Sequence, residues 1–317
     1  MGTLSLFEEP SRFDREGLRR RLSALAAEGV FIGTSSWKYE GWLGQIYTRE
    51  RYSSRGRFSP RRFQTECLAE YAEVFPVVCG DFSFYQFPAP VFWERLFASA
   101  PRPLKFAFKV PEEITVHTFP GHPRYGPRAG EGNPMFLNAE LFDSAFLALL
   151  RPWRDRIAVL ILEFGTFSRE CYRDVHEFIE DLEPFLAALP KDFQYAVEIR
   201  NPAFLAPEYL ATLRQNRIVH VLNAWTRMPE IGVQMRVPGI DTAGLTVVRA
   251  LLRHGRAYEE AVRMFSPYEQ VQDPNPQTRE ALRATISRAR ERAEPAYIFV
   301  NNRLEGNAPG TIEAITA

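Results

Sequence analysis

The chain has 317 residues, and its 39 basic side chains balance 39 acidic ones, so the formal net charge is zero. This balance excludes a global attraction to polyanions, and any basic surface must be local. The length suits two domains or one large α/β barrel, because such barrels routinely exceed about 200 residues as a single unit. The hydrophobic share of 45% is ordinary for a globular protein with a sizeable core.

The cysteines and the N-terminus bear on the cellular compartment. Three cysteines, Cys67, Cys79 and Cys171, are widely spaced and form neither a disulfide framework nor a zinc-ligand pattern, which is typical of a reducing cytoplasm. No apolar run approaches the ~20 residues of a membrane span. The first residues lack the regions of a signal peptide, and Leu6 stands where N-myristoylation needs Ser or Thr. We therefore expect a cytoplasmic protein without membrane attachment.

Short apolar runs alternate with helical patterns along the whole chain. Leucines and alanines at helical spacing predict a first helix over 11–29, capped by Ser11 or Asp14 and ended by Gly29. Eight strands are predicted at Val30–Thr34, Pro76–Phe84, Leu104–Val110, Ile157–Phe164, Gln194–Ile199, Ile218–Leu222, Leu245–Leu251 and Ala296–Val300. Helices are predicted at 64–75, 90–98, 138–150, 169–189, 207–216 and 277–293.

This alternation of eight strands with helices predicts an α/β protein with a single (β/α)8 TIM barrel. The barrel domain would occupy residues 30–317. Residues 1–29 would form an N-terminal extension with one extra helix.

Two predicted loops stand out. Thr48–Arg62 contains six arginines against a single acidic residue, Glu50. It is either a solvated surface loop or an anion-attracting rim. Glu112–Leu137 is long and rich in Gly and Pro, and loops of this length are usually lids, binding loops or disordered segments.

The C-terminal ends of the strands hold the functional groups in such barrels. Here they supply three candidate catalytic residues, Lys109, Glu163 and Glu198. The candidate ligand-binding residues are Ser35, Trp37, Tyr39, Trp42, Asp81, Ser83, Tyr85, Arg200, Asn223, Arg249, Asn301, Asn302 and Glu305. Loops begin at these positions, so a structural role is an equal alternative for each. Glu198 could pair with Arg200 inside the mouth of the barrel. Lys109 could pair with Glu163.

Five motifs in order carry a resemblance to a known family: IGTSSW, FSFYQFP, FKVP followed by ITVH, AVEIRNPAF and FVNNRLEGNA. From about Phe31 to the C-terminus the chain resembles the domain-of-unknown-function family 72 (DUF72), the YecE-like proteins. The resemblance implies a (β/α)8 barrel. It implies no activity, because the family is named for lacking a known one.

The chain departs from the family pattern at several strand ends. Cys79 and Asp81 stand where the pattern has Glu and Asn, and Glu112 replaces an Arg. Glu163 replaces a Gln, and Asn223 stands where Asp is common. Other departures are Asn201 and Phe204, where His and Trp are usual. The chain thus resembles a divergent branch of the family.

These residues can be compared with what two kinds of chemistry need, a retaining glycosidase and a metal-dependent enzyme. A retaining glycosidase needs two carboxylates about 5 Å apart, and Glu163 with Glu198 could supply them, but the seventh strand offers Arg249 instead of a carboxylate. The five histidines lack ligand spacing, so we assign no metal ligands and no cofactor is evident. Asp81, Glu163 and Glu198 could still hold Mg²⁺ or Mn²⁺ through oxygen ligands.

The cations Lys109, Arg200 and Arg249, beside aromatic side chains, predict an anion-binding, aromatic-lined pocket at the C-terminal face of the barrel. One hypothesis is an enzyme, a hydrolase or isomerase acting on a phosphorylated sugar or nucleotide with Glu198 or Glu163 as general base. The other is a non-catalytic barrel that binds nucleotides or single-stranded nucleic acid through the loop arginines. The sequence does not decide between them, nor does it set the oligomeric state.

Overall fold

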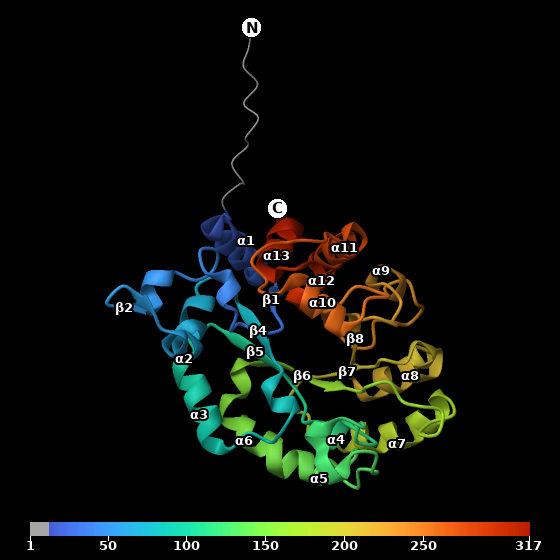
Figure 1. Cartoon of the computed structure of the whole chain (residues 1–317). Coiled ribbons are helices and arrows are strands. Elements are labelled where there is room, and N and C mark those ends of the chain that lie inside the picture. The colour runs from blue at the N-terminus through green and yellow to red at the C-terminus, as the bar shows by residue number, and fades with distance from the viewer. Residues whose placement is uncertain (1–12) are drawn as a thin grey trace.

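The computed structural model describes residues 13–317, and its centre is a closed barrel of eight parallel strands (Figure 1). The strand order around the barrel is β1-β10-β9-β8-β7-β6-β5-β4. The strands are β1 (Val30–Thr34), β4 (Val77–Gly80), β5 (Lys105–Lys109), β6 (Ile157–Glu163), β7 (Tyr195–Glu198), β8 (Val219–Ala224), β9 (Thr246–Ala250) and β10 (Ala296–Val300). The predicted (β/α)8 barrel and its eight strands are confirmed.

Helices surround the barrel. The longer ones are α1 (Arg15–Ala27), α2 (Pro60–Tyr71), α3 (Pro90–Ser99), α7 (Val175–Ala188), α8 (Pro207–Asn216), α10 (Tyr258–Phe265), α11 (Pro276–Arg292) and α13 (Ala308–Thr316). The shorter ones are α4 (Glu112–Thr115), α5 (Ala139–Phe142), α6 (Ala148–Leu150), α9 (Ile231–Gln234) and α12 (Asn302–Glu305). The sequence analysis did not predict α4, α9, α10, α12 or α13. Across residues 13–317 we find no helix whose length and apolarity would let it cross a membrane.

The extra helix α1 is capped by Asp14, one of the two residues predicted to cap it. The Asp14 carboxylate accepts a hydrogen bond of 2.8 Å from the backbone N–H of Gly17. The other predicted cap, Ser11, lies outside the described residues, as does the N-terminal stretch on which the expected absence of a signal peptide or lipid anchor rests. Leu18 and Leu22 are buried in the core between the strands and the helices. The helix packs on β1 and α13.

Strand geometry divides the core into two layers. Successive side chains on a strand point to opposite faces. Outward-facing residues such as Ile32 and Leu160 pack under the helices. Inward-facing residues such as Val159 and Val221 form a separate apolar cluster inside the barrel. The lower part of the barrel is therefore a filled core rather than a pore.

Three predicted elements have different bounds for identifiable reasons. The helix predicted at 64–75 is α2, which already begins at Pro60 because the hydroxyl of Ser59 caps it by accepting a hydrogen bond from the N–H of Arg62, and it ends at Tyr71. The predicted strand Pro76–Phe84 ends at Gly80 and continues as a 3-10 turn over Phe82–Phe84. The predicted helix at 169–189 begins only at Val175, because the side chain of Asp174 caps it by accepting hydrogen bonds from the N–H groups of the next residues.

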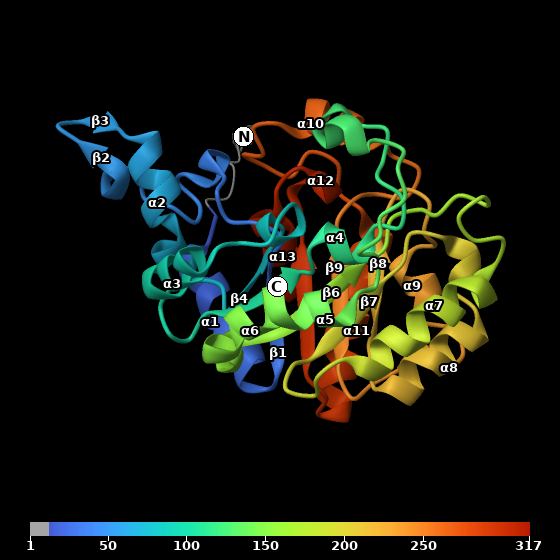
Figure 2. The same ribbon diagram turned by 90° about the horizontal axis from the view of Figure 1, so that it is seen from below.

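The arginine-rich segment is an ordered arm. A 3-10 turn (Arg49–Tyr52) leads into an antiparallel hairpin of β2 (Ser53–Ser54) and β3 (Arg57–Phe58). Figure 2 shows this hairpin projecting from the body of the molecule beyond α2. The buried carboxylate of Glu70 on α2 anchors its base by accepting hydrogen bonds from the main chain and side chain of Thr48 and the hydroxyl of Tyr52.

Gly33 on β1 lies where two barrel strands pack closely together. A Cβ added there would lie 1.8 Å from the carbonyl oxygen of Val77 on β4, so β1 or β4 would have to move. We expect Gly33→Ala to lower the free energy of unfolding by about 1–3 kcal/mol, as overpacking of a tight core does. Gly165→Ala is the matched control, because a Cβ there has no atom within 4 Å. Urea denaturation measures both, and equal stability of the two variants would contradict this packing.

Candidate functional site

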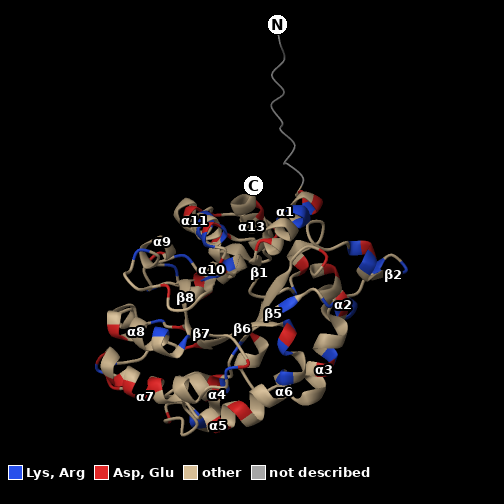
Figure 3. Ribbon diagram, turned by 180° about the vertical axis from the view of Figure 1, so that it is seen from behind, with Lys and Arg blue, Asp and Glu red and all other residues tan. Residues whose placement is uncertain are grey.

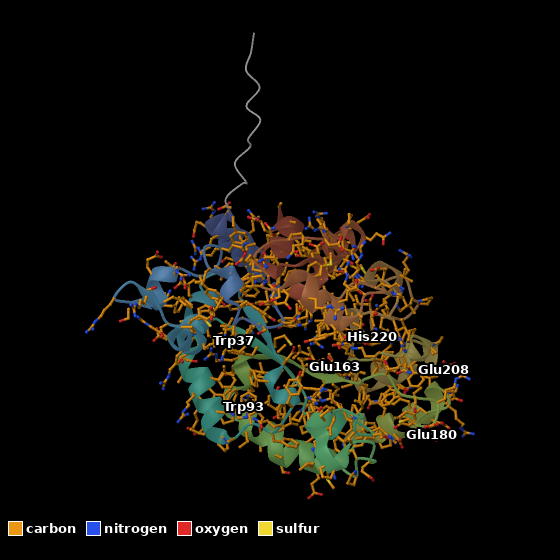
Figure 4. All side chains as sticks on the ribbon, viewed as in Figure 1. Trp37, Trp93, Glu163, Glu180, Glu208 and His220 are labelled. Atoms are coloured by element: carbon orange, nitrogen blue, oxygen red, sulfur yellow. The ribbon has the colours of Figure 1, made fainter. Side chains whose placement is uncertain are left out.

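The apolar interior of the barrel gives way to a polar layer at the C-terminal ends of the strands. Because inward-facing positions recur every second residue, each strand or the residue just past it adds one side chain above the apolar cluster. These side chains are Ser35, Asp81, Lys109, Glu163, Glu198, Asn223, Arg249 and Asn301. All eight belong to the candidate residues from the sequence. Figure 4 shows Glu163 near the centre of the barrel.

Arg249 is the central cation of this layer, and only 2% of its side chain is exposed. Its Nη1 atom lies 2.5 Å from Glu163 Oε2 and 2.5 Å from Glu198 Oε2. Its Nη2 atom lies 3.2 Å from Asp81 Oδ1. One guanidinium thus joins carboxylates from three different strands.

Two further cations complete what we call the mouth network: Asp81, Lys109, Glu163, Glu198, Arg200 and Arg249. Arg200 Nη2 lies 2.6 Å from Glu198 Oε1 and 3.1 Å from Glu163 Oε2. Lys109 Nζ lies 3.1 Å from Glu163 Oε1. The predicted pairs of Glu198 with Arg200 and of Lys109 with Glu163 are both present. All three cations contact Glu163, whose side chain is 16% exposed, whereas Glu198 is fully buried.

The network fixes the charge of its members. Burial alone would raise the pKa of Glu163, but the charges of Lys109, Arg200 and Arg249 outweigh it and hold that pKa well below its ordinary value of 4.5. Burial likewise opposes the charge on Arg249, yet Glu198 and Glu163 raise its pKa well above the ordinary value. Glu163 is therefore a weak base in this arrangement, and the network is an array of fixed charges.

Arg303 on α12 adds a fourth cation that the sequence analysis missed. Its guanidinium lies 4.5 Å from the ring centre of Tyr258, and its buried Nε atom has no hydrogen-bond partner in the described part of the chain. Burial raises the pKa of Tyr39, and the charge of Arg303 opposes that rise. Arg303 follows β10 by three residues, so extending the strand-end rule into the next turn of helix would have found it. The three cations and three carboxylates around Arg249, taken together with Arg303, have one positive charge in excess.

Aromatic rings lie on two of the cations. Lys109 Nζ is 3.6 Å from the ring centre of Phe84, and the guanidinium carbon of Arg200 is 3.9 Å from that of Trp225. Such contacts stabilise a desolvated cation. Phe84, within the motif FSFYQFP, was not among the candidate residues.

The rim of the mouth contains two exposed tyrosines. Tyr85 is 59% exposed and Tyr258 is 44% exposed. Arg124 lies 4.8 Å from the ring centre of Tyr85 and is held by Glu112 at 2.5 Å. Arg124 belongs to the long loop after β5, which contains α4 and a 3-10 segment (Pro123–Arg128). Figure 2 shows this loop and α10 above the strand ends, and Figure 1 separates them across the barrel axis.

A cavity of about 500 Å³ opens beside the network, between α2 and α3. Trp37, Phe82 and Phe92 form much of its apolar wall, and Lys38 with Arg95 belong to its rim. Asp81 also lines it. Since Asp81 contacts Arg249 as well, this carboxylate connects the cavity to the mouth network.

Several candidate residues form hydrogen bonds with other parts of the protein that hold the fold together. Trp42 is fully buried and donates from Nε1 to Asn302 Oδ1 at 3.2 Å. Asn302 also accepts from the N–H of Ala308, and the side chain of Asn301 caps α12. The structure places these three outside the mouth network. Any role of theirs in ligand binding stays a prediction.

Ser35, Ser83 and Asn223 are buried near the strand ends, whereas Tyr39 is only partly buried. The hydroxyl of Ser83 donates to the carbonyl oxygen of Lys109 at 2.7 Å. The amide of Asn223 donates to the carbonyl oxygen of Ile199 at 3.2 Å, while its side-chain oxygen has no partner among the described residues. The hydroxyl of Ser35 is likewise unpartnered in the described structure. Ser35 and Asn223 therefore keep free hydrogen-bonding groups near the mouth.

The geometry can be compared with the two chemistries considered from the sequence, a retaining glycosidase and a Mg²⁺ or Mn²⁺ site. The Oε2 atoms of Glu163 and Glu198 are at most about 5 Å apart, close to the spacing in retaining glycosidases, but both contact Arg249 and Glu198 is fully buried. The three carboxylates considered for Mg²⁺ or Mn²⁺ all contact the same guanidinium, which balances their charge. Within residues 13–317 no group of three His, Cys, Asp or Glu is arranged to hold a metal ion.

Comparisons with known proteins agree with this fold. The family model described as "Protein of unknown function DUF72" matches residues 31–317. A crystal structure of a DUF72 family protein from Enterococcus faecalis superimposes with a TM-score of 0.58 at 18% identity, covering 90% of this chain and 94% of that one. One from Thermotoga maritima gives a TM-score of 0.57 at 20% identity, covering 90% and 97%. At these identities the likeness concerns the fold alone. No curated protein matches the sequence.

Glu305 is a candidate ligand-binding residue, and its contacts favour the alternative that its role is structural. It is fully buried and accepts hydrogen bonds from the N–H of Asn275 (2.6 Å), the guanidinium of Arg279 (2.7 Å) and the hydroxyl of Thr311 (2.8 Å). We expect Glu305→Ala to lower the free energy of unfolding by about 3–5 kcal/mol, because it leaves the largely buried Arg279 unpaired and takes the acceptor from the buried N–H of Asn275 and hydroxyl of Thr311. Urea denaturation measures the loss, with the exposed Glu291→Ala as control. A variant as stable as the control would favour a ligand-binding role.

Glu163 should make the stability depend on pH. Because its folded pKa lies below its ordinary value, the unfolded chain takes up this proton first as the pH falls. The stabilisation from ionised Glu163 is thus complete above about pH 5 and is lost as the pH falls through 4.5 towards the folded pKa. We expect the difference in unfolding free energy between wild type and Glu163→Gln to shrink from about pH 6 to about pH 4. Urea denaturation at several pH values measures it, and a constant difference would refute the ion pairing.

Proposed function

Because the chain belongs to the DUF72 family, whose description states no function, we propose from the site alone that the mouth of the barrel binds a small anionic molecule. The observation that carries the proposal is the convergence of three buried cations, Lys109, Arg200 and Arg249, on the carboxylate of Glu163, which is itself partly exposed. Arg303 adds a charge with no hydrogen-bond partner at its Nε in the described structure.

Glu163 occupies a place that an anionic group of a ligand would suit. Its two oxygens contact Lys109 on one side and Arg200 with Arg249 on the other. A phosphate or carboxylate entering beside it would compete for the same donors, since guanidinium groups bind such anions through paired hydrogen bonds. Arg200 Nη1 has no hydrogen-bond partner among residues 13–317 and is one donor available for this exchange.

The rim supports a ligand that also carries a ring. Tyr85 and Tyr258 are the exposed aromatic side chains there, and the guanidiniums of Arg124 and Arg303 lie against them. Aromatic faces stack on sugars and bases without requiring one sequence or one substituent. A phosphorylated sugar or a nucleotide combines both features, with its phosphate towards Lys109 and its ring towards the tyrosines.

Catalysis by a hydrolase or isomerase is the second candidate, and the position of Glu163 favours it. An anion that takes over Lys109 and Arg200 would remove two of the charges that depress the Glu163 pKa. The freed carboxylate would then be a stronger base beside the ligand. Glu198 is fully buried and paired with Arg200 and Arg249, so its part would be to orient these cations.

A thermal-shift series tests the proposal. Sugar phosphates and nucleotides should raise the midpoint of wild type in a dose-dependent way, by about 2.7 kcal/mol of stabilisation at a hundredfold excess over Kd, whereas the unphosphorylated compounds should not. Arg303→Ala and Lys109→Met should lose the shift because each removes a cation of the mouth. Arg263→Ala, an exposed arginine on α10, should retain it.

The same series separates the two candidates. An equal shift with unphosphorylated compounds, or none with any anion, would refute the anion site. Where a compound binds, turnover that disappears in Glu163→Gln while the shift persists would support catalysis. Binding without turnover in the wild type would leave a binding protein.

A further inference from the structure

We infer that the arginine-rich hairpin and the cavity between α2 and α3 together form a binding track for single-stranded nucleic acid. This track is distinct from the small-ligand site in the mouth. It comprises residues 48–62, the exposed face of α2, and the cavity wall at Trp37, Phe82 and Phe92. The inference rests on the charges of the hairpin, on their continuation along α2, and on the aromatic cavity at the end of the track.

The hairpin presents cations that no carboxylate neutralises. Figure 3 shows Lys and Arg gathered where β2 projects. Of the six arginines in 48–62, Arg51 pairs with Glu73 at 2.6 Å and Arg62 pairs with Glu66 at 2.9 Å. The other four form no salt bridge within residues 13–317, and they are Arg49, Arg55, Arg57 and Arg61. Arg49, Arg55 and Arg57 lie on the projecting arm, beside the single acidic residue Glu50, and Arg61 begins α2. This local excess of positive charge attracts phosphates although the chain has zero net charge.

The tip of the hairpin holds an arginine where the backbone favours another residue. Arg55 and Gly56 have φ angles of 50° and 76°, as in the tight turns that prefer Asn-Gly. A side chain with a Cβ is strained in this region by about 1–2 kcal/mol, and arginine lacks the short polar group that relieves Asn. The base of the arm is firm, because Tyr52 packs edge-on against Phe63 at 5.1 Å. The turn therefore presents the exposed Arg55 at the tip of an arm whose base is packed against α2.

The charges continue from the arm to the cavity. Arg61 lies in the first turn of α2, and Gln64 and Thr65, three and four residues on, line the cavity. Residues at this spacing share one face of a helix. Lys38 and Arg95 stand at the cavity rim, and neither forms a salt bridge in the described chain. A backbone of phosphates could thus run from the hairpin along α2 to the rim.

The cavity offers a place for an unpaired base. Its volume of about 500 Å³ exceeds that of a single base, and three aromatic side chains belong to its wall. Phe92 is 37% exposed and its ring lies 4.8 Å from that of Phe82, which in turn meets Trp37 edge-on at 6.2 Å. Stacking of bases on such rings is tolerant of sequence. A duplex keeps its bases inside, so this combination favours a single strand.

A membrane surface is the less suited partner. Ser53, Ser54, Arg55, Gly56 and Arg57 form the end of the hairpin, and none of them is a large apolar side chain. Interfacial segments bind membranes by burying apolar residues together with cationic ones. The arm has the charge without the apolar partner, whereas the aromatic groups lie in the recessed cavity.

Fluorescence anisotropy with a labelled oligo-thymidylate of about twelve nucleotides, at several salt concentrations, tests the track. For wild type, the logarithm of the association constant should fall linearly with the logarithm of the salt concentration. The triple variant Arg55→Ala, Arg57→Ala, Arg61→Ala should lower the magnitude of that slope by about 2, since each phosphate contact on a single strand contributes about 0.7. The control triple variant Arg20→Ala, Arg102→Ala, Arg154→Ala removes the same charge from other exposed surfaces and should keep the slope.

Phe92→Ala separates base stacking from charge. It should weaken binding about tenfold at every salt concentration and leave the slope unchanged. Arg303→Ala, at the mouth, should have no effect on oligonucleotide binding, so failure here is distinguishable from failure of the small-ligand site. Equal slopes for the two triple variants, no binding by wild type, or equally tight binding to duplex DNA would overturn the inference. So would tighter binding to vesicles of anionic phospholipid than to the oligonucleotide.

Discussion

The burial of Arg249 inside the barrel is the constraint on which the site depends. An unpaired guanidinium in this position would cost several kcal/mol, so carboxylates must face it from other strands of the barrel. Three do so, Asp81, Glu163 and Glu198, and they exceed the charge of Arg249 by two. Lys109 and Arg200 restore neutrality, and each contacts one or both of the two glutamates. The six groups are therefore one electrostatic unit, and no member can be assigned a role without its partners.

Much of this arrangement follows from the sequence because strand periodicity is a local rule and the closed parallel barrel brings all eight strand ends to one face. Inward-facing positions lie two apart, so the polar residue at each strand end necessarily joins the same layer above the apolar core. The rules do not say which charges pair, nor which polar side chains the fold itself uses. Trp42 and Glu305 look like mouth residues in the sequence, yet their partners are Asn302 and Arg279. Arg303 was missed because it lies on a helix, where strand periodicity no longer applies.

This geometry shows where the departures from the family pattern lie in the structure. The resemblance places a glutamate at the position of Cys79, an amide at Asp81 and an amide at Glu163. In this chain burial raises the pKa of the Cys79 thiol to about 12, so the inward-facing position below the network is neutral. The carboxylates stand one layer higher instead, and both contact Arg249. The substitutions thus fall on neighbouring groups of one network and move its negative charge towards the mouth.

A chain without net charge can still offer two positive surfaces, because pairing rather than composition decides what a ligand meets. Acidic side chains neutralise most arginines of the helices through exposed pairs, such as Arg19 with Glu16 and Arg290 with Glu28. Among the cations without a salt bridge in the described residues are Arg55 and Arg57 on the hairpin, Lys38 and Arg95 at the cavity rim, and Arg303 beside the mouth. Asp81 lies where the last two meet, 33% exposed and bonded to Arg249. Anions bound at both places would repel each other across this residue, so occupancy of one site would lower affinity at the other, and linkage makes that effect reciprocal.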